Sequence, residues 1–347
     1  MNSAGAMNIQ YTCLVDTPFA LALYLLKMDC DAVSRTFFCV GKNLSQEIVD
    51  LLPYARRFHV EQNRSRIVRL LFRLKCFWYN ILFIRGSEVY GQDHLVFSSQ
   101  LICRKRYTLI EDGPRTYSMN KDLPGRRMLN VTNPFIKAAL YVLNGPIYLK
   151  SFGRNGQCKN RWVTTDEDAD LYQCKGMRVE RLDVGLLWQQ ASKEKKAQVL
   201  RLFDGEETIL DIDLPSKGAE TILLTQPIVE DCGLSEEEFA EVYRDLINNN
   251  LQKGVVIKPH PRDKLDYERI FPNCKVIRTR VPMQLLCAFG MNFKRAITIC
   301  STSISDFPAE TEIVWIGNEV NAKILKAYGH VDPPRKFRNV LRVARVK

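Results

Sequence analysis

Short runs of apolar and β-branched residues alternate with longer stretches of helical periodicity along this sequence. The first run covers 8–15, the next covers 35–41, and the alternation resumes at residue 220. Because strands that alternate with helices form parallel sheets, the pattern predicts an α/β fold. Further strands are expected at 106–113, 220–227, 254–261, 294–303 and 311–317, another short apolar run lies at 93–99, and helices are expected at 18–28, 45–52, 235–249, 282–291 and 320–329.

The two series of strands and helices predict two Rossmann-like domains. The alternation breaks between Gly153 and Ser216, and 347 residues are enough for two α/β cores. We expect an N-terminal domain over 1–190, a C-terminal nucleotide-binding domain over 191–330 and a basic tail over 331–347.

The start of one helix can be placed closely. Ser235 precedes Glu238 by three residues at the beginning of a long amphipathic stretch. This spacing is typical of a capping box, in which each side chain satisfies a backbone N–H of the other.

Positive charge is concentrated in two amphipathic segments. The net charge is +11, and in the segment 64–79 Arg66, Arg69 and Arg73 share one helical face among apolar residues. Such helices are typical of anionic membrane surfaces, although a solvated helix face over a core stripe would look the same. No nucleic-acid-binding signature accompanies the charge, so we expect an anionic membrane and no nucleic acid as partner. The tail repeats the basic pattern with Arg338, Arg342 and Arg345.

The cysteines and the first residues indicate the cellular compartment in which the protein is expected. The eleven cysteines are scattered and form no CxxC pair, which argues for free thiols in a reducing compartment and against a disulfide framework. The first apolar run has no basic segment before it and is interrupted by Asp16. We therefore expect neither a signal peptide nor a membrane span.

Reactive side chains follow three of the expected strands. Ligands of open parallel sheets bind at the carboxyl ends of the strands, so these positions are candidates for a site. The acidic group lies in the first half of the chain and the other two lie in the second, and two facing domains would bring them across one cleft. The three groups are Glu111-Asp112-Gly113, His260-Pro261 and Ser301-Thr302-Ser303.

Each group has a catalytic and a structural interpretation. A carboxylate beside a glycine can accept a proton from an attacking hydroxyl, or can cap the next helix. The imidazole of His260 can donate a proton or hold an anionic leaving group, and Pro259 and Pro261 restrict the backbone around it. A hydroxyl-rich turn can bind an anion, or serve as a plain N-cap. The flanking Lys258 and Arg262 favour phosphate as that anion.

Two acidic stretches resemble metal sites. Asp211 and Asp213 form a DxD of the kind that binds a divalent ion, whereas the stretch with Asp166, Asp168 and Asp170 lacks the glycine and distal glutamate of an EF-hand loop. We interpret both as solvated turns and expect no metal ligand among them. A metal at Asp211 would make activity sensitive to a chelator.

Four short motifs occur in a family-specific order: "IEDG", "KPHPRD", "PMQLL" and "CSTS". Together they resemble the motif set of bacterial sialyltransferases, in particular the lipooligosaccharide sialyltransferases of glycosyltransferase family 52, and they are shared with bacterial polysialyltransferases. The resemblance covers most of the chain and includes the opening strand and helix.

The resemblance implies a GT-B architecture, with two Rossmann-like domains facing a central cleft. It also implies inverting, metal-independent transfer of sialic acid from CMP-sialic acid to a sugar hydroxyl of a lipooligosaccharide or capsular glycan, at the cytoplasmic face of the bacterial inner membrane. No cofactor is expected, and a homodimer is a further expectation. Two alternatives remain open: a transferase on the same scaffold that uses CMP-Kdo or a UDP-sugar, and a non-enzymatic membrane-associated binding protein.

The resemblance also assigns roles to residues. Asp112 or Glu111 is similar to the general base, with Glu230 and Asp231 after "LLTQP" as alternatives. His260 is similar to the general acid or to the group that stabilises the departing phosphate. Relatives often carry a glutamate for the ribose hydroxyls where Gln284 stands, so this position departs from the pattern. The residues expected to bind the donor are Gly113, Lys258, Pro261, Arg262, Gln284, Ser301, Thr302 and Ser303.

Overall fold

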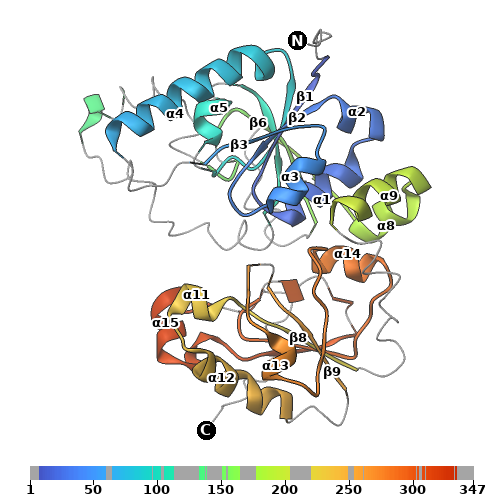
Figure 1. Ribbon diagram of the computed structural model, residues 1–347. Coiled ribbons are helices and arrows are strands. Elements are labelled where there is room, and N and C mark those ends of the chain that lie inside the picture. Colours follow the sequence, from blue (N-terminus) through green and yellow to red (C-terminus); the bar gives the residue numbers. More distant parts are fainter. Residues whose placement is uncertain are drawn as a thin grey trace. The chain divides into compact units, whose positions relative to one another are not determined.

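The chain forms two compact units, Met1–Leu202 and Phe203–Lys347 (Figure 1). Each is described by itself below. The sequence placed the boundary at 190/191, but the helix that follows this position belongs with the first unit, where the buried Lys195 donates a hydrogen bond to the Met28 carbonyl. The computed structural model describes residues 8–59, 65–95, 97–102, 105–112, 133–136, 138, 151–153, 155–164, 177–203, 220–248, 254–260, 262–301, 303–304, 307–308, 310–331 and 333.

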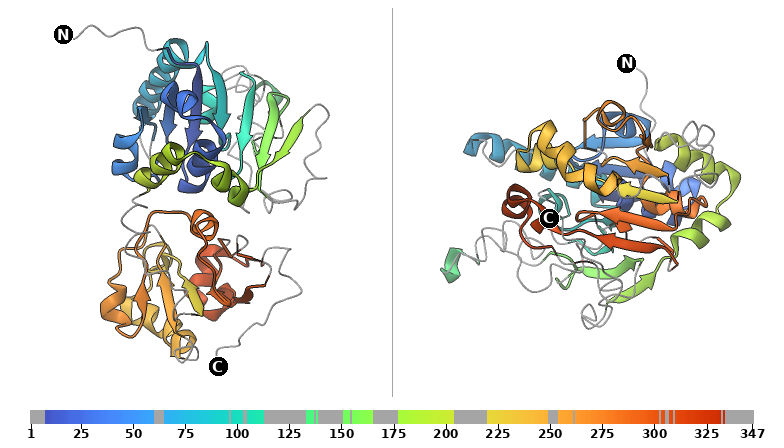
Figure 2. Two further views of the ribbon diagram at one scale, coloured as in Figure 1. Left: turned by 90° about the vertical axis from the view of Figure 1, so that its right-hand side faces the viewer. Right: turned by 90° about the horizontal axis from the view of Figure 1, so that it is seen from below.

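The first unit is built on a seven-stranded parallel sheet with the order β3-β2-β1-β4-β5-β6-β7. Its helices lie on both faces of the sheet (Figure 2). The strands are β1 (Tyr11–Val15), β2 (Thr36–Val40), β3 (Tyr54–Arg57), β4 (Glu88–Gly91), β5 (Tyr107–Ile110), β6 (Cys158–Val163) and β7 (Arg178–Arg181). The helices are α1 (Pro18–Lys27), α2 (Cys30–Ser34), α3 (Gln46–Leu51), α4 (Arg66–Tyr79), the π-helix η1 (Asn80–Ile84), α5 (Ser98–Leu101), α8 (Val184–Gln190) and α9 (Lys193–Leu202).

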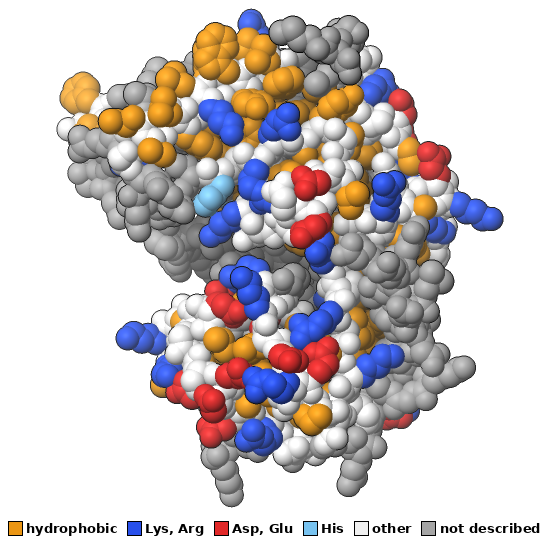
Figure 3. Space-filling view, viewed as in Figure 1, with side chains coloured by type: hydrophobic (Ala, Val, Ile, Leu, Met, Phe, Trp, Pro, Cys, Tyr) orange, Lys and Arg blue, Asp and Glu red, His pale blue; other side chains and the backbone are white. Residues whose placement is uncertain are grey.

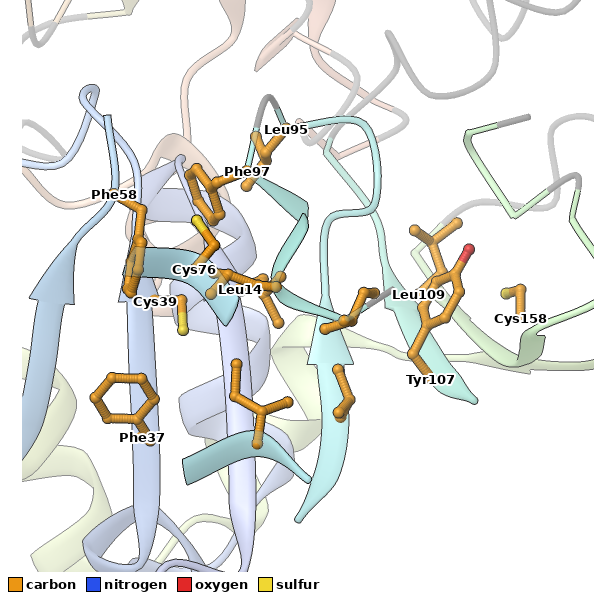
Figure 4. Close-up of a cluster of buried hydrophobic side chains, with 14 of the residues drawn as sticks. Leu14, Phe37, Cys39, Phe58, Cys76, Leu95, Phe97, Tyr107, Leu109 and Cys158 are labelled. Atoms are coloured by element: carbon orange, nitrogen blue, oxygen red, sulfur yellow. The ribbon is translucent and has the colours of Figure 1, made fainter. Parts of the chain in front are cut away.

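The central strands are apolar on both faces, as a sheet covered on two sides requires. On one face Leu14 and Cys39 pack with Cys76 of α4 in a buried cluster (Figure 4). On the other face Phe38 makes an edge contact with Tyr24 of α1, with ring centroids 5.7 Å apart. Alternate residues of β1 and β2 therefore face opposite sides of the sheet, and the expected α/β fold with a parallel sheet is confirmed.

Two parts of the first half could not be assigned from the apolar pattern. Alternating strands and helices continue after Gly153, because β6, β7, α8 and α9 complete the first unit there. β7 has the sequence "RVER" and no buried residue, so it lacks the apolar run of a central strand. The described residues of the apolar run at 93–99 form no strand, and the end of this run enters the short helix α5.

The second unit has a five-stranded parallel sheet with the order β10-β9-β8-β11-β12. Its strands are β8 (Thr221–Leu224), β9 (Val255–Lys258), β10 (Lys275–Val276), β11 (Arg295–Thr298) and β12 (Glu312–Trp315). Its helices are α11 (Ile228–Cys232), α12 (Glu236–Asn248), α13 (Tyr267–Ile270), α14 (Met283–Ala288), the 3₁₀ helix η7 (Asn318–Val320) and α15 (Ala322–Tyr328).

The predicted capping box at the start of α12 is confirmed. The Ser235 backbone N–H donates to Glu238 Oε2 at 2.8 Å, and the Glu238 N–H donates to Ser235 Oγ at 3.2 Å. The helix then buries Phe239 and Tyr243 against the sheet. In the part of the chain that the structure describes, no helix has both the length and the apolar character needed to cross a bilayer.

Candidate active site

Each sheet contains one place where the order of the strands reverses. In the first unit the chain runs outward from β1 to β3 and then returns to place β4 on the other side of β1. In the second unit the corresponding neighbours are β8 and β11. Ligands of doubly wound sheets bind at such switch points, outside the carboxyl ends of the strands. The residues that follow these strands are therefore the ones to inspect.

The N-terminal cluster comprises Asp16, Thr17, Gln92, His94 and Asp112, which follow β1, β4 and β5. Asp112 Oδ1 accepts hydrogen bonds from Thr17 Oγ1, at 2.9 Å, and from Gln92 Nε2. Its Oδ2 lies 3.0 Å from His94 Nε2. The side chain of Asp112 remains 17% exposed. It is thus oriented by three neighbours while a substrate can still reach it.

A second carboxylate stands beside Asp112. Burial is the main cause that raises the pKa of Asp16, and the charge of Asp112 adds to it. The backbone N–H of Asn43 donates to Asp16 Oδ1 at 2.9 Å, which opposes this shift. Gly41 makes room for the carboxylate, since a Cβ there would lie 1.9 Å from Asp16 Oδ1. Two acids in one cluster with different environments are a common basis of acid–base division of labour.

His94 is positioned by a buried aspartate. Asp93 is 1% exposed and accepts hydrogen bonds from the backbone N–H groups of Phe152 and Gly153, at 2.7 and 2.9 Å. These bonds stabilise Phe152 in the left-handed region, at φ 59°. The Phe152 ring then stacks on the His94 imidazole, with centroids 4.7 Å apart. The backbone strain of Phe152 accordingly serves to orient His94.

Glu111 has a different environment from its neighbour Asp112. It is 2% exposed, and its carboxylate accepts hydrogen bonds from the Thr164 backbone N–H at 2.5 Å and from Thr164 Oγ1 at 3.1 Å. The bond ties the end of β5 to the end of β6. Glu111 therefore has the buried, hydrogen-bonded environment of a structural acid. Asp112 is exposed enough to act on a substrate.

The C-terminal cluster comprises Thr225, Lys258, His260, Arg262 and Ser301, which lie at or beyond the ends of β8, β9 and β11. The His260 backbone N–H donates to Thr225 Oγ1 at 3.3 Å. The Arg262 backbone N–H donates to His260 Nδ1 at 3.2 Å. Because Nδ1 accepts this bond, the proton of the neutral ring resides on Nε2. The imidazole can thus present an N–H donor at the edge of the sheet.

Two basic side chains in this cluster, Lys258 and His260, are poorly solvated. Burial lowers the pKa of Lys258, which is 6% exposed, to about 8. The pKa of His260 is lowered to about 4, first by burial and then by the charges of Arg262 and Lys258. Among the residues that the structure describes, none forms an ion pair with Lys258. A desolvated ammonium without a carboxylate favours an anionic ligand.

Glu230 and Asp231, the two alternatives for the general base, follow β8 and have different environments. Asp231 accepts two hydrogen bonds from the Arg262 guanidinium, at 3.0 and 2.7 Å, and one from Tyr328 at 2.9 Å. The bond from Arg262 is the main cause that lowers the pKa of Asp231. Glu230 is exposed in the first turn of α11. Asp231 is therefore a structural anchor for Arg262, whereas Glu230 remains an accessible carboxylate.

The hydroxyl turn follows β11 directly. The Ser301 backbone N–H donates to Thr298 Oγ1 at 2.9 Å, and Thr298 Oγ1 donates to the Leu224 carbonyl at 3.0 Å. These bonds fix the turn to the end of β8. Ser303 is half-buried, as is Gln284 in the first turn of α14.

Several expected residues lie outside the described part of the chain. They are Gly113, Pro261 and Thr302 of the candidate site, Asp166, Asp168, Asp170, Asp211 and Asp213 of the two acidic stretches, and Arg338, Arg342 and Arg345 of the tail. Within the described residues, no group of three or more His, Cys, Asp or Glu side chains is arranged to hold a metal ion.

The sequence analysis missed Thr17, Gln92 and His94. They follow β1 and β4, and β4 is a four-residue strand, "EVYG", with an exposed glutamate at its start. Such a strand has too few apolar residues to be found by its pattern. The polar run "GQDH" that follows Tyr90, in a chain with four histidines, is the signal that was available.

The chain belongs to glycosyltransferase family 52, whose sequence model matches residues 82–317. It is therefore a glycosyltransferase. A protein of Haemophilus influenzae that carries no functional description is 29% identical over 273 residues, which is 79% of this chain and 81% of that protein. The expected family membership is confirmed.

Solved structures show the same fold. A 2,6-sialyltransferase of Photobacterium sp. JT-ISH-224, solved with CMP and lactose, matches with a TM-score of 0.61 and 13% identity over 92% of this chain and 74% of that chain. The GT-B domain of a sialyltransferase of Photobacterium damselae matches with a TM-score of 0.57 and 14% identity, over 92% of this chain and 96% of that one. The expected GT-B fold is confirmed.

The different environments of the two neighbouring acids lead to a stability prediction. Glu111→Gln should lower the free energy of unfolding by about 1–3 kcal/mol, because it weakens two buried hydrogen bonds to Thr164. Asp112→Asn should change it by less than about 1 kcal/mol, because the asparagine oxygen can still accept from Thr17 and Gln92. Urea unfolding of both variants measures the difference. Equal losses would contradict the structural role of Glu111.

The depressed pKa of His260 leads to a pH prediction. The unfolded chain binds a proton near the ordinary pKa of 6.5, and the folded chain binds it only near pH 4. Stability should therefore be lost as the pH falls from about 6.5 towards 4, and this group should account for about 2 kcal/mol at pH 5. Urea unfolding at neutral pH and near pH 5 should show a smaller loss in His260→Gln than in the unaltered protein. Identical pH dependence would exclude a buried neutral imidazole.

Proposed function

We propose that this glycosyltransferase transfers sialic acid from CMP-sialic acid to a terminal sugar hydroxyl of a lipooligosaccharide or capsular glycan. The observation that carries the proposal is that the desolvated Lys258 and the Nε2–H donor of His260 both lie at the carboxyl end of β9. This arrangement suits the phosphate of a nucleotide donor. Family membership and a fold shared with a sialyltransferase solved with CMP support the choice.

The C-terminal cluster would stabilise the leaving group. As the bond between the anomeric carbon and the phosphate oxygen breaks, CMP departs with the electron pair and its phosphate gains charge. The Nε2–H of His260, the ammonium of Lys258 and the hydroxyl of Ser301 are suitable donors for these oxygens. At neutral pH His260 begins as a neutral donor, and a bound phosphate would raise its pKa towards the charged form. Thr302, Ser303 and the backbone near Pro261 are proposed to complete this phosphate site.

Asp112 is the base that we propose for the acceptor. The acceptor oxygen forms the new bond to the anomeric carbon on the face opposite the departing CMP, and its proton passes to the carboxylate. This displacement inverts the configuration and needs no metal ion. Thr17, Gln92 and His94 orient the carboxylate, and His94 is thus a positioning residue. Of the four acids considered, Glu111 and Asp231 are engaged in structural bonds, so Glu230 is the remaining alternative.

Gln284 and its departure from the family pattern bear on the donor. We propose that its amide hydrogen-bonds the ribose hydroxyls, with Gly113 leaving room for the acceptor. An amide binds a ribose less strongly than a carboxylate does. Because this position departs from the family pattern, one second candidate remains open, a transferase of the same fold that uses CMP-Kdo or a UDP-sugar.

We propose an anionic membrane surface as the place of the reaction, at the cytoplasmic face of the bacterial inner membrane. The support is the net charge of +11 and a lipid-linked acceptor, because anionic lipids attract basic proteins. The oligomeric state is left open, with a homodimer as one option.

The donor can be identified without knowledge of the acceptor. Purified protein treated with EDTA should slowly release CMP from CMP-sialic acid by hydrolysis, and should leave CMP-Kdo and UDP-sugars intact. Chromatography of the nucleotide products measures this release. Hydrolysis of another donor in place of CMP-sialic acid would support the second candidate. Loss of activity in EDTA that returns with a divalent ion would contradict the metal-independent mechanism.

The base can be separated from the donor site by kinetics. Asp112→Asn should lower kcat for transfer by roughly 10²–10⁴-fold, the usual contribution of a general base. Its affinity for CMP, measured by calorimetry, should stay within about twofold because Asp112 is not assigned to the donor phosphate. Glu230→Gln is the matched control and should retain kcat. The reverse result would move the role of base to Glu230.

A further inference from the structure

The segment between β9 and α13 carries His260 and lacks a backbone donor at two positions beside it. Pro259 and Pro261 have no N–H group, so His260 supplies the only backbone N–H of this tripeptide. That N–H donates to Thr225 Oγ1 at 3.3 Å, and the His260 carbonyl accepts from the Asp263 N–H at 2.8 Å. The position of the imidazole therefore depends on where Thr225 Oγ1 is held.

Thr225 Oγ1 is held in turn by a buried tyrosine and a carboxylate. Tyr267 Oη lies 2.8 Å from Thr225 Oγ1 and 2.5 Å from Asp263 Oδ2. The Leu265 backbone N–H donates to Asp263 Oδ1 at 3.1 Å. Tyr267, Thr225 and Asp263 are only 0%, 3% and 9% exposed. Because water has little access to these groups, loss of one of them leaves a buried polar atom without its partner.

The Tyr267 side chain is directed into the core although α13 lies at the surface. Figure 3 shows acidic and basic side chains side by side on the face of the second unit where Figure 1 draws α12 and α13. Glu268, the next residue, belongs to this charged surface and pairs with Arg278 at 2.7 Å. Tyr267 instead packs against Phe239, with ring centroids 5.5 Å apart. Core packing thus fixes the ring and gives its hydroxyl a definite position beside Thr225.

Asp263 is the acidic end of this hydrogen-bond network. Burial is the main cause that raises its pKa, and the hydrogen bonds from Tyr267 and Leu265 oppose the shift. A hydrogen bond to a carboxylate is charge-assisted and is stronger than one between two hydroxyls. Asp263 therefore fixes the Tyr267 hydroxyl, and through it the oxygen that accepts from His260.

We propose that Tyr267 and Asp263 are positioning residues that hold the backbone of His260 through Thr225. They act by fixing the place from which the Nε2–H of His260 reaches the departing phosphate. This role in catalysis rests on the proposed function, whereas the hold on the imidazole can be observed without any substrate. A network that only stabilised the fold would leave the environment of the imidazole unchanged when one hydroxyl is removed.

Removal of one hydroxyl tests this role by nuclear magnetic resonance. In the unaltered protein the ring signals of His260, assigned by their absence in His260→Gln, should not titrate between about pH 5 and about pH 8, because burial is the main cause that holds its pKa at about 4. In Tyr267→Phe the loosened segment should expose the imidazole to water, so the signals should titrate within this range. Thr225→Val should have the same effect.

Tyr24→Phe is the matched control for the loss of a buried hydroxyl. Tyr24 is also 0% exposed, and its hydroxyl shares a hydrogen bond with Thr36 Oγ1 at 2.7 Å in the first unit. Its replacement should lower the resistance to urea about as much as Tyr267→Phe does, and should leave the titration of His260 unchanged. A change in His260 that is confined to Tyr267→Phe is then no consequence of lower stability.

Kinetics test the path through Thr225. With CMP-sialic acid as donor, Tyr267→Phe should lower kcat roughly tenfold, because a donor to the developing charge is displaced. KM for CMP-sialic acid should change by less than about threefold, because the phosphate gains its charge only as the bond breaks. The double variant with Thr225→Val should lose no more activity than Thr225→Val alone. Additive losses would overturn the proposed path.

The outcomes are distinct from those of the proposed function. The titration needs no substrate, so it decides the role of Tyr267 even if no nucleotide sugar is hydrolysed. A neutral His260 throughout this pH range in folded Tyr267→Phe and Thr225→Val would overturn the inference and leave the proposed activity in force. Titration of His260 within this range in the unaltered protein would overturn it as well.

Discussion

Every strand pair that the structure describes is parallel, and this constraint determines where polar side chains can gather. Parallel strands need helical crossovers, which cover both faces of the sheet and make the strand interiors apolar. The polar side chains of both clusters accordingly lie at or beyond the strand ends. At the two reversal points, β1/β4 and β8/β11, neighbouring crossovers leave in opposite directions and the end of the sheet stays open. Both clusters occur there for this reason.

The two clusters differ in how many of their polar and charged groups have partners within the protein. In the N-terminal cluster, Asp112 already accepts hydrogen bonds and has His94 beside it. In the C-terminal cluster, Lys258 and His260 are desolvated, and the positive charges of Arg262 and Lys258 lower the pKa of His260 further although Asp231 opposes them. Burying a cation without a partner costs stability, and an anionic ligand would offset that cost. One cluster is thus organised before substrate binds, and the other is organised for a substrate that supplies the missing charge.

The sequence predicted the elements whose apolar residues are continuous. β1, β2, β8 and β11 are buried strands, and their runs were visible in the pattern. Asp112, His260 and the serines could be selected because each follows such a run. β4 and β7 could not be found, since short edge or half-exposed strands carry polar residues at the positions that a pattern search requires to be apolar. His94 was missed with β4.

Glu111 and Asp112 show that their position in the sequence cannot decide which of two adjacent acids faces the site. The two acids are adjacent, so strand geometry alone points them in opposite directions without saying which direction is the site. Only the position of Thr164 on the neighbouring strand end, far away in sequence, identifies Glu111 as the buried partner. Sequence spacing also could not show that Asp231 is structural, because its partner Arg262 follows a different strand.

Helix α4 presents a related ambiguity in one element. Helical periodicity in the segment 64–79 indicates an apolar stripe, and a solvated outer face was the alternative interpretation. The helix has apolar residues on two sides, and the periodicity cannot say which side the core will take. The fold buries Phe72 and Cys76, and the η1 turn, closed by the Arg85 N–H to the Asn80 carbonyl, accommodates one extra residue. Ile84 is thereby fully buried, while Ile81 and Leu82 stay outside and extend the apolar surface beyond α4. The exposed apolar residues on the outer side of α4 are therefore a consequence of which side of the helix the fold buries.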